Sequence, residues 1–197
     1  MTFNFQTWMQ AIWSSIVEPS DAARKVVASD FPREALWTGL ALVAVLNVIL
    51  LALLQLFTPA PVIDDTTISL SPFGYAGIVG TFMVLFVFTL QQTGRFFGGI
   101  GELNGTLAIV VWFQAISLTL EAVQLVLVLI SPSIASLFGL LSLGALIWIF
   151  LNFINVLHGF QSLGKSALVV FLALLSTAFV AGLILSLFGI APIGGTV

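Results

Sequence analysis

Long apolar stretches alternate with short polar segments along this chain. The clearest stretch follows the glycine-rich segment 96–105: from Thr106 to Ile130 it contains one charged residue, Glu121. At 1.5 Å per residue, about 25 helical residues cover roughly 37 Å, which exceeds the ~30 Å hydrocarbon core of a bilayer. Four other stretches have the same character. The pattern predicts five membrane-spanning helices, at about residues 35–57, 75–90, 106–130, 134–156 and 167–188.

The residues before the first span form a different pattern. Apolar side chains between residues 3 and 16 recur at helical spacing, and no charge interrupts them. This helix is too short to span. It lies either in the plane of the membrane interface, with its tryptophans at headgroup depth, or packed on the protein's own bundle. A second short helix should begin at Glu18-Pro19 and stop near Asp30, since Phe31 precedes a proline. The expected interfacial anchors are Trp8, Trp13 and Trp37.

These elements define the expected fold class and its division. The chain is predicted to be an all-α integral membrane protein, a bundle of five transmembrane helices preceded by short amphipathic, interfacial helices. Residues 1–33 form the cytoplasmic N-terminal segment, residues 34–188 the transmembrane domain, and residues 189–197 a short tail. All seven prolines lie outside the five spans, so each span is expected to be a continuous helix.

Composition supports a membrane location and limits the chemistry. The chain is 60% hydrophobic and 7% charged, against about 25% charged residues in a soluble domain. With five Lys and Arg residues it has no basic patch for nucleic acid, so the expected surroundings are the lipid bilayer. Because there is no cysteine, disulfides and thiolate metal sites are excluded. We expect no cofactor and no metal.

The basic residues predict the orientation. All five fall before span one, between spans two and three, or between spans four and five, which is the same side of the membrane. The opposite loop carries Asp64 and Asp65 and no Lys or Arg. The positive-inside rule then places the N-terminus in the cytoplasm and the C-terminus outside.

A polar stripe runs along one face of the third span. Its members fall within roughly an 80° arc at 100° per residue, and lipid cannot hydrogen-bond them, so the stripe should face the bundle. One interpretation is a relay for a proton, an ion or a polar substrate centred on the carboxylate. The other, which we favour, is hydrogen bonding that joins this carboxylate to a neighbouring helix. The stripe consists of Gln114, Ser117, Glu121 and Gln124.

Polar residues also gather near the expected cytoplasmic ends of the spans. His158 is a weak metal candidate, because there is no second His and no Cys, and it is interpreted as an interfacial hydrogen-bonding group. Glu102 and Asn104 could bind a headgroup or a partner, although a helix-start cap is the preferred interpretation. The cytoplasmic-side cluster is Arg95, Glu102, Asn104, Asn152, Asn155, His158 and Lys165.

No arrangement of these residues predicts catalysis. The glycines at 94–105 lack the Gly-Lys-Ser/Thr ending of a phosphate loop, and the single His lies across the membrane from Asp64 and Asp65. We therefore expect a non-enzymatic membrane protein. It would act as a scaffold, assembly factor or accessory subunit through helix contacts with a membrane partner or a second copy. The alternative is a small transporter or channel-like protein that uses the stripe at Glu121.

The sequence resembles a bacterial member of the Ypt-interacting protein (Yip) family over roughly residues 8–188. The resemblance implies five spans, a cytosolic N-terminus, a place in the bacterial inner membrane and no catalytic residue. Eukaryotic relatives act in vesicle traffic and bind prenylated small GTPases; that activity is not carried over to this sequence. Three segments carry the resemblance: the N-terminal aromatic helix that runs into Glu18–Ala22, then Gly98–Leu103 leading into Ala108–Val111, and the end of span four, Ile147–Gly159, with its short link to Lys165–Ala167.

The absence of cysteine makes the topology directly testable. Single cysteines at Thr67 and Val197 should react with an impermeant thiol reagent added to intact cells, because both positions are expected outside. A cysteine at Ser29 should react only after the membrane is opened. Labelling of Ser29→Cys in intact cells would reverse the predicted orientation.

Overall fold

The chain is folded as a set of α-helices. The computed structural model describes residues 4–57 and 72–187. In these residues, α3 to α7 are long and apolar enough to cross a membrane, which confirms the predicted all-α membrane fold class. The helices are α1 (Phe5–Val17), α2 (Pro19–Ala28), α3 (Arg33–Phe57), α4 (Pro72–Phe96), α5 (Leu103–Ile130), α6 (Pro132–His158) and α7 (Leu163–Leu187).

The largest difference from the expected spans is the length of α4. The apolar pattern ended at residue 90, yet the helix continues to Phe96. Gln91 is buried within the protein, so a polar side chain does not mark the end of the helix here. The chain leaves the helix only at Gly98, whose φ of 79° is a left-handed conformation that favours glycine. The labelling positions 67 and 197 and the acidic loop residues Asp64 and Asp65 lie outside the described residues.

Capping residues explain where several helices begin. The Asn4 side chain accepts a hydrogen bond from the backbone N–H of Gln6 at 2.9 Å and so caps α1. Pro19 opens α2 at a position where its missing N–H costs nothing. Ser131 joins α5 to α6, and its side chain caps α6 ahead of Pro132.

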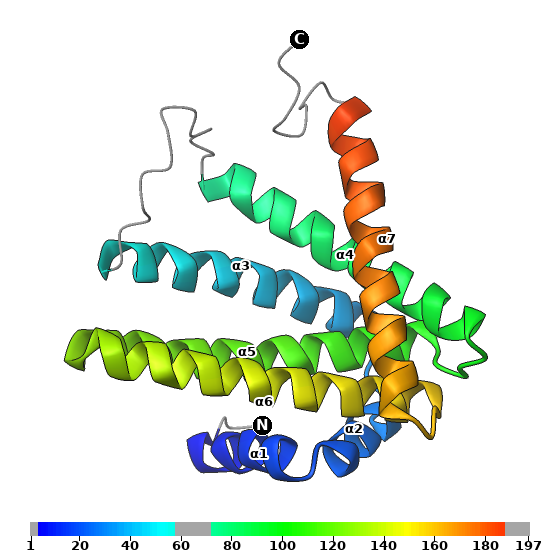
Figure 1. The fold of residues 1–197 in the computed structure, drawn as a ribbon, viewed down its shortest axis with the longest axis horizontal. Coiled ribbons are helices and arrows are strands. Elements are labelled where there is room, and N and C mark those ends of the chain that lie inside the picture. Colours follow the sequence, from blue (N-terminus) through cyan, green and yellow to red (C-terminus); the bar gives the residue numbers. More distant parts are fainter. Residues whose placement is uncertain (1–3, 58–71, 188–197) are drawn as a thin grey trace.

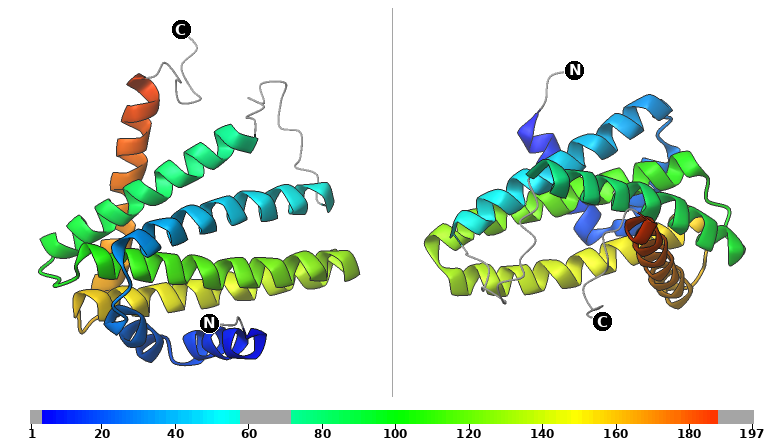
Figure 2. Two further views of the ribbon diagram at one scale, coloured as in Figure 1. Left: turned by 180° about the vertical axis from the view of Figure 1, so that it is seen from behind. Right: turned by 90° about the horizontal axis from the view of Figure 1, so that it is seen from above.

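In the described part of the chain, the other helices are arranged around the antiparallel pair α5 and α6. Figure 1 shows α3 along one side of this pair and α1 and α2 along the other. The helices α4 and α7 pack against each other, and α7 meets α6 near the loop that joins them. From there α7 runs away from α5 and α6, as the left view in Figure 2 also shows. The bundle is therefore closed at one end and splayed at the other.

The hydrophobic core lies at the closed end, where α4 and α6 finish and α5 and α7 begin. The side chains of Leu107, Phe153 and Val169 have no exposed area there. At the other end, large apolar side chains such as Leu56, Ile130 and Leu187 are exposed on the protein, and so face lipid in a membrane. The close packing of helices within the protein is therefore concentrated at the end where the basic residues lie.

The N-terminal helix uses two faces. Ser15 is buried, and its Oγ accepts a hydrogen bond from the indole Nε1 of Trp112 on α5 at 3.1 Å. Trp8 packs edge-on against the same indole, with ring centroids 5.6 Å apart. Trp13, in contrast, is 66% exposed. The face with Trp8 therefore packs on the bundle, whereas the flank with Trp13 is free to meet the membrane interface. Among the anchors, Trp37 instead lies against Phe88, at 6.2 Å between centroids.

This division predicts different quenching of the two tryptophans in reconstituted protein. In a Trp148→Phe background, which removes the half-exposed indole on α6, Trp13→Phe should lower the fluorescence that brominated lipids quench, and Trp8→Phe should lower it little, because Trp8 packs against Trp112. Aqueous iodide should reach neither side chain. Strong iodide quenching that disappears in Trp13→Phe would show that this flank faces water and not the interface.

Candidate functional site

The polar residues of the stripe on α5 lie in three different environments. Gln114 Oε1 accepts a hydrogen bond from Asn47 Nδ2 on α3 at 3.3 Å. Ser117 donates to Glu121 Oε1 at 2.8 Å, within α5 itself. Gln124 lies against α6, where a side chain at Gly139 would come within 2.6 Å of its amide nitrogen. The four residues therefore make three separate contacts: Gln114 with α3, Ser117 with Glu121 inside α5, and Gln124 with α6.

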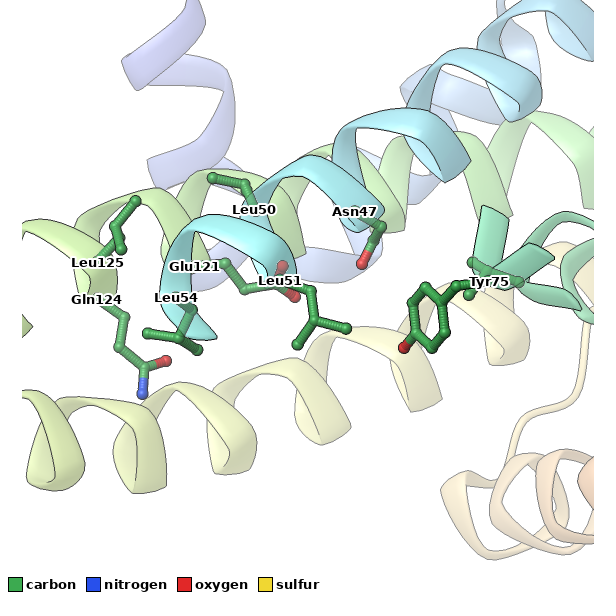
Figure 3. A pocket seen from close by; sticks show the side chains of 9 residues that line it. Asn47, Leu50, Leu51, Leu54, Tyr75, Glu121, Gln124 and Leu125 are labelled. Carbon is green, nitrogen blue, oxygen red and sulfur yellow. The ribbon is translucent and has the colours of Figure 1, made fainter. Parts of the chain in front are cut away.

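The hydrogen bond expected from Glu121 to a neighbouring helix is not found among the described residues. Its partner Ser117 is one turn earlier on the same helix, and Gln114 provides the interhelical bond instead. The reason is geometric, because Glu121 faces a cavity of about 210 Å³ between α3, α4 and α5. Figure 3 shows the carboxylate, the Asn47 amide and the Tyr75 ring around this space. The remaining wall is mostly leucine.

The polar residues at the closed end do not form one cluster. Asn152 is buried and accepts a hydrogen bond from the Ser20 hydroxyl at 3.1 Å, which joins α2 to α6. Asn155 accepts from the backbone N–H of Ser162 at 3.2 Å and so fixes the loop that follows α6. Both are structural contacts within the protein.

His158 occupies the centre of the closed end, in a cradle of glycines. Its side chain is 1% exposed, and neither ring nitrogen has a hydrogen-bond partner among the described residues. It is therefore a buried ring and not the interfacial hydrogen-bonding group expected from the sequence. A Cβ added to Gly94, Gly99 or Gly101 would come within 2.1, 2.5 or 2.7 Å of that ring, well inside van der Waals contact.

Two similar turns hold this cradle together. At the end of α4, Gly99 N–H donates to Gly94 C=O at 2.8 Å, and Gly98 N–H donates to Arg95 C=O at 2.9 Å. The end of α6 repeats the pattern around Gly159, which also has a positive φ of 68°. Both are Schellman motifs, which satisfy the last carbonyls of a helix.

A backbone hydrogen bond and two ring contacts complete the closed end. The Ile100 N–H donates to the His158 C=O at 3.2 Å and ties the α4–α5 loop to the end of α6. Phe160 stacks on the imidazole with centroids 5.2 Å apart. The ammonium group of Lys165 lies 4.6 Å from the Phe160 ring centroid, in cation–π range.

The charged members of the predicted cytoplasmic-side cluster lie on the surface. Arg95 lines an open hollow of about 590 Å³ on the α4–α7 side. Glu102 and Asn104 line a separate hollow of about 480 Å³ that also includes Asp30. Glu102 precedes α5, but its side chain makes no cap hydrogen bond. The described residues contain no group of three His, Cys, Asp or Glu that could hold a metal ion.

Sequence reasoning missed several residues, and some gave a signal. Asn47 is an isolated amide in an apolar stretch, so the rule used for Glu121 would have identified it. Thr89 and Thr177, whose hydroxyls are 2.6 Å apart and join α4 to α7, gave none, because a lone Thr in a span normally bonds its own helix. The glycine spacing was visible, but only the fold shows that it encloses an imidazole.

The cradle predicts a specific cost for added volume. Gly94→Ala should lower the free energy of unfolding by about 1–3 kcal/mol, since the methyl group must displace the His158 ring. Gly77→Ala is the matched control: nothing lies within 4 Å of its Cβ position, so the better helix propensity of Ala should leave it neutral or slightly stabilised. Unfolding in mixed micelles measures both variants.

A double variant distinguishes the clash from a backbone effect. With His158→Ala already present, Gly94→Ala should cost little, because the ring that it displaces is gone. An unchanged cost in that background would contradict the cradle.

No curated protein and no solved structure matches the chain. The Yip1 domain family model matches residues 13–188, a range that begins inside α1 and includes the glycine cradle and all five long helices. Together with the five membrane-spanning helices, this match shows that the chain is an integral membrane protein of the Yip1 domain family.

Proposed function

We propose that this protein is a non-enzymatic scaffold, assembly factor or accessory subunit of the bacterial inner membrane. It acts through helix contacts with a membrane-protein partner or with a second copy of itself, and its N-terminus is cytoplasmic. The observation that carries the proposal is an apolar crevice of about 550 Å³ between α4, α5, α6 and α7, at the side where α7 departs from the bundle.

The walls of the crevice suit an uncharged helix. They consist almost entirely of aromatic and aliphatic side chains, with Gln114 and Tyr75 as the polar exceptions. On α7 the side that carries Val170 and Leu174 continues, at helical spacing, into Ala178 and Gly182. Nothing lies within 4 Å of the Cβ position of Gly182. Small residues let two helix backbones approach closely, which acyl chains do not require. The proposed occupant of the crevice is therefore a transmembrane helix of a partner subunit.

The surroundings of the cavity at Glu121 favour a scaffold function over a transport function. Toward the closed end, the next buried side chains on α3 and α5 are apolar, among them Leu40, Val43 and Ile116. A path for a proton or polar substrate would have to cross this packed layer, whose side chains offer it no hydrogen bonds. The cavity is therefore better explained as a local feature of one end of the bundle.

Photo-crosslinking in native membranes tests the proposal. A photoreactive residue at Leu174, in the crevice, should give a discrete protein adduct whose peptides come from an apolar helix of a partner. The same residue at Leu183, on the opposite side of α7 from Leu174, should label mainly lipid. Peptides from this chain itself would identify a second copy as the partner. Lipid adducts alone at Leu174 would overturn the scaffold.

A matched pair of variants shows whether the adduct depends on the crevice. Gly182→Leu should abolish the Leu174 adduct, because its side chain obstructs the approach of another helix. Gly77→Leu makes the same chemical change at another open glycine, on the face of α4 turned away from the crevice, and should leave the adduct intact.

A further inference from the structure

The cavity between α3, α4 and α5 has a chemistry that the scaffold does not use. Its polar rim contains Asn47 on α3, Tyr75 on α4, and Glu121 and Gln124 on α5, within a wall of leucine and valine (Figure 3). Glu121 lies nine residues before the end of α5, or roughly 13 Å along the helix axis. The carboxylate is therefore within the membrane and open to a cavity near the splayed end.

The hydrogen bonds already made leave mainly acceptors facing the cavity. The Asn47 Nδ2 donates to the Val43 C=O at 3.2 Å and to Gln114 Oε1 at 3.3 Å, so its carbonyl oxygen remains as an acceptor. Ser117 donates to one oxygen of Glu121, and no described residue donates to the other. The Tyr75 hydroxyl can accept as well as donate. A ligand that matches this set is a compact, positively charged donor.

The charge of the Glu121 carboxylate also calls for a cationic ligand. Arg24 and Asp21 form the one ion pair among the described residues, at the far end of the protein, and Glu121 has no cationic partner in the described spans. An ionised carboxylate away from water is strongly disfavoured unless a cation pairs with it. A cationic ligand would provide that pairing.

The volume of the cavity and the number of its oxygen atoms limit the class of ligand further. At about 210 Å³ the cavity is smaller than the ~300 Å³ at which ordinary ligand pockets begin. A divalent ion such as Ca²⁺ takes six or more oxygens, often several carboxylates, and this site has one carboxylate. An ammonium group instead needs about three acceptors, and its short alkyl stem fits the leucine wall.

We propose that this cavity binds a primary ammonium group, with Glu121 as the counter-ion and Asn47 and Tyr75 as further acceptors. The group belongs either to the headgroup of an aminophospholipid, whose chains lie along the leucine wall, or to a small free amine. The two sources share this chemistry, and the experiment separates them.

The test uses the full-length protein in nanodiscs and native mass spectrometry. In discs of phosphatidylethanolamine and phosphatidylglycerol, the wild type should retain ethanolamine lipid, whereas phosphatidylcholine, which has no N–H donor, should not replace it. Glu121→Gln should lower that retention roughly tenfold or more, the loss expected for a charge-assisted hydrogen bond. Glu34→Gln makes the same change at an exposed carboxylate outside the cavity and should have no effect.

Free ethylamine supplies the other arm. If the source is a free amine, millimolar ethylamine should raise the thermal stability of the wild type but not of Glu121→Gln, and no ethanolamine lipid should be retained. Because Glu121→Gln could disturb folding, Tyr75→Phe is examined in parallel and should weaken whichever binding is seen several-fold. The absence of both lipid retention and ethylamine stabilisation overturns the proposal, as does binding that survives unchanged in Glu121→Gln.

Discussion

The contact between His158 and its three glycines is the constraint on which the rest of the fold depends. It brings the end of α4 and the loop that leads into α5 within van der Waals distance of one ring at the end of α6. Lipid offers helices no hydrophobic drive toward one another, so close packing and hydrogen bonds must hold them. Glycine permits this closeness, and the Ile100 N–H bond to the His158 carbonyl adds a backbone link. The ends of α4 and α6, each a Schellman motif, are thereby fixed relative to each other and to the start of α5.

Fixing the helices at one end leaves the other end free to diverge. The buried side chains gather around the cradle, whereas α7 leaves the bundle after its contact with α4 at Thr177. In water such a splayed end would expose a large apolar surface. In a membrane, lipid or another helix covers it, so the sequence need not close it. The crevice beside α7 and the cavity at Glu121 both result from this divergence.

The sequence predicted the elements better than their contacts. The five spans and two short helices follow from runs of apolar residues and from capping residues such as Pro19, because those signals are local. The shared face of Gln114 and Glu121 also follows from helical spacing. Which helix each residue meets depends on tertiary packing, and Gln114 has the interhelical role that the spacing favoured for Glu121. For His158 the residue type suggested a polar contact, but the packing buries it without a partner among the described residues.

Within the stripe, position 121 carries a carboxylate where its hydrogen bond would need only an amide. An amide side chain is enough for the contacts made at positions 114 and 124. Gln114 accepts the hydrogen bond from Asn47, and Gln124 fits against Gly139. Glutamine at position 121 would also accept the bond from Ser117 and would avoid the cost of a charge in the membrane. The one property that Glu121 adds over glutamine is its ability to carry a negative charge or release a proton. Toward the closed end the way is blocked by apolar packing, so a proton path finds no continuation there. The ammonium ligand proposed above would use this charge within the cavity itself.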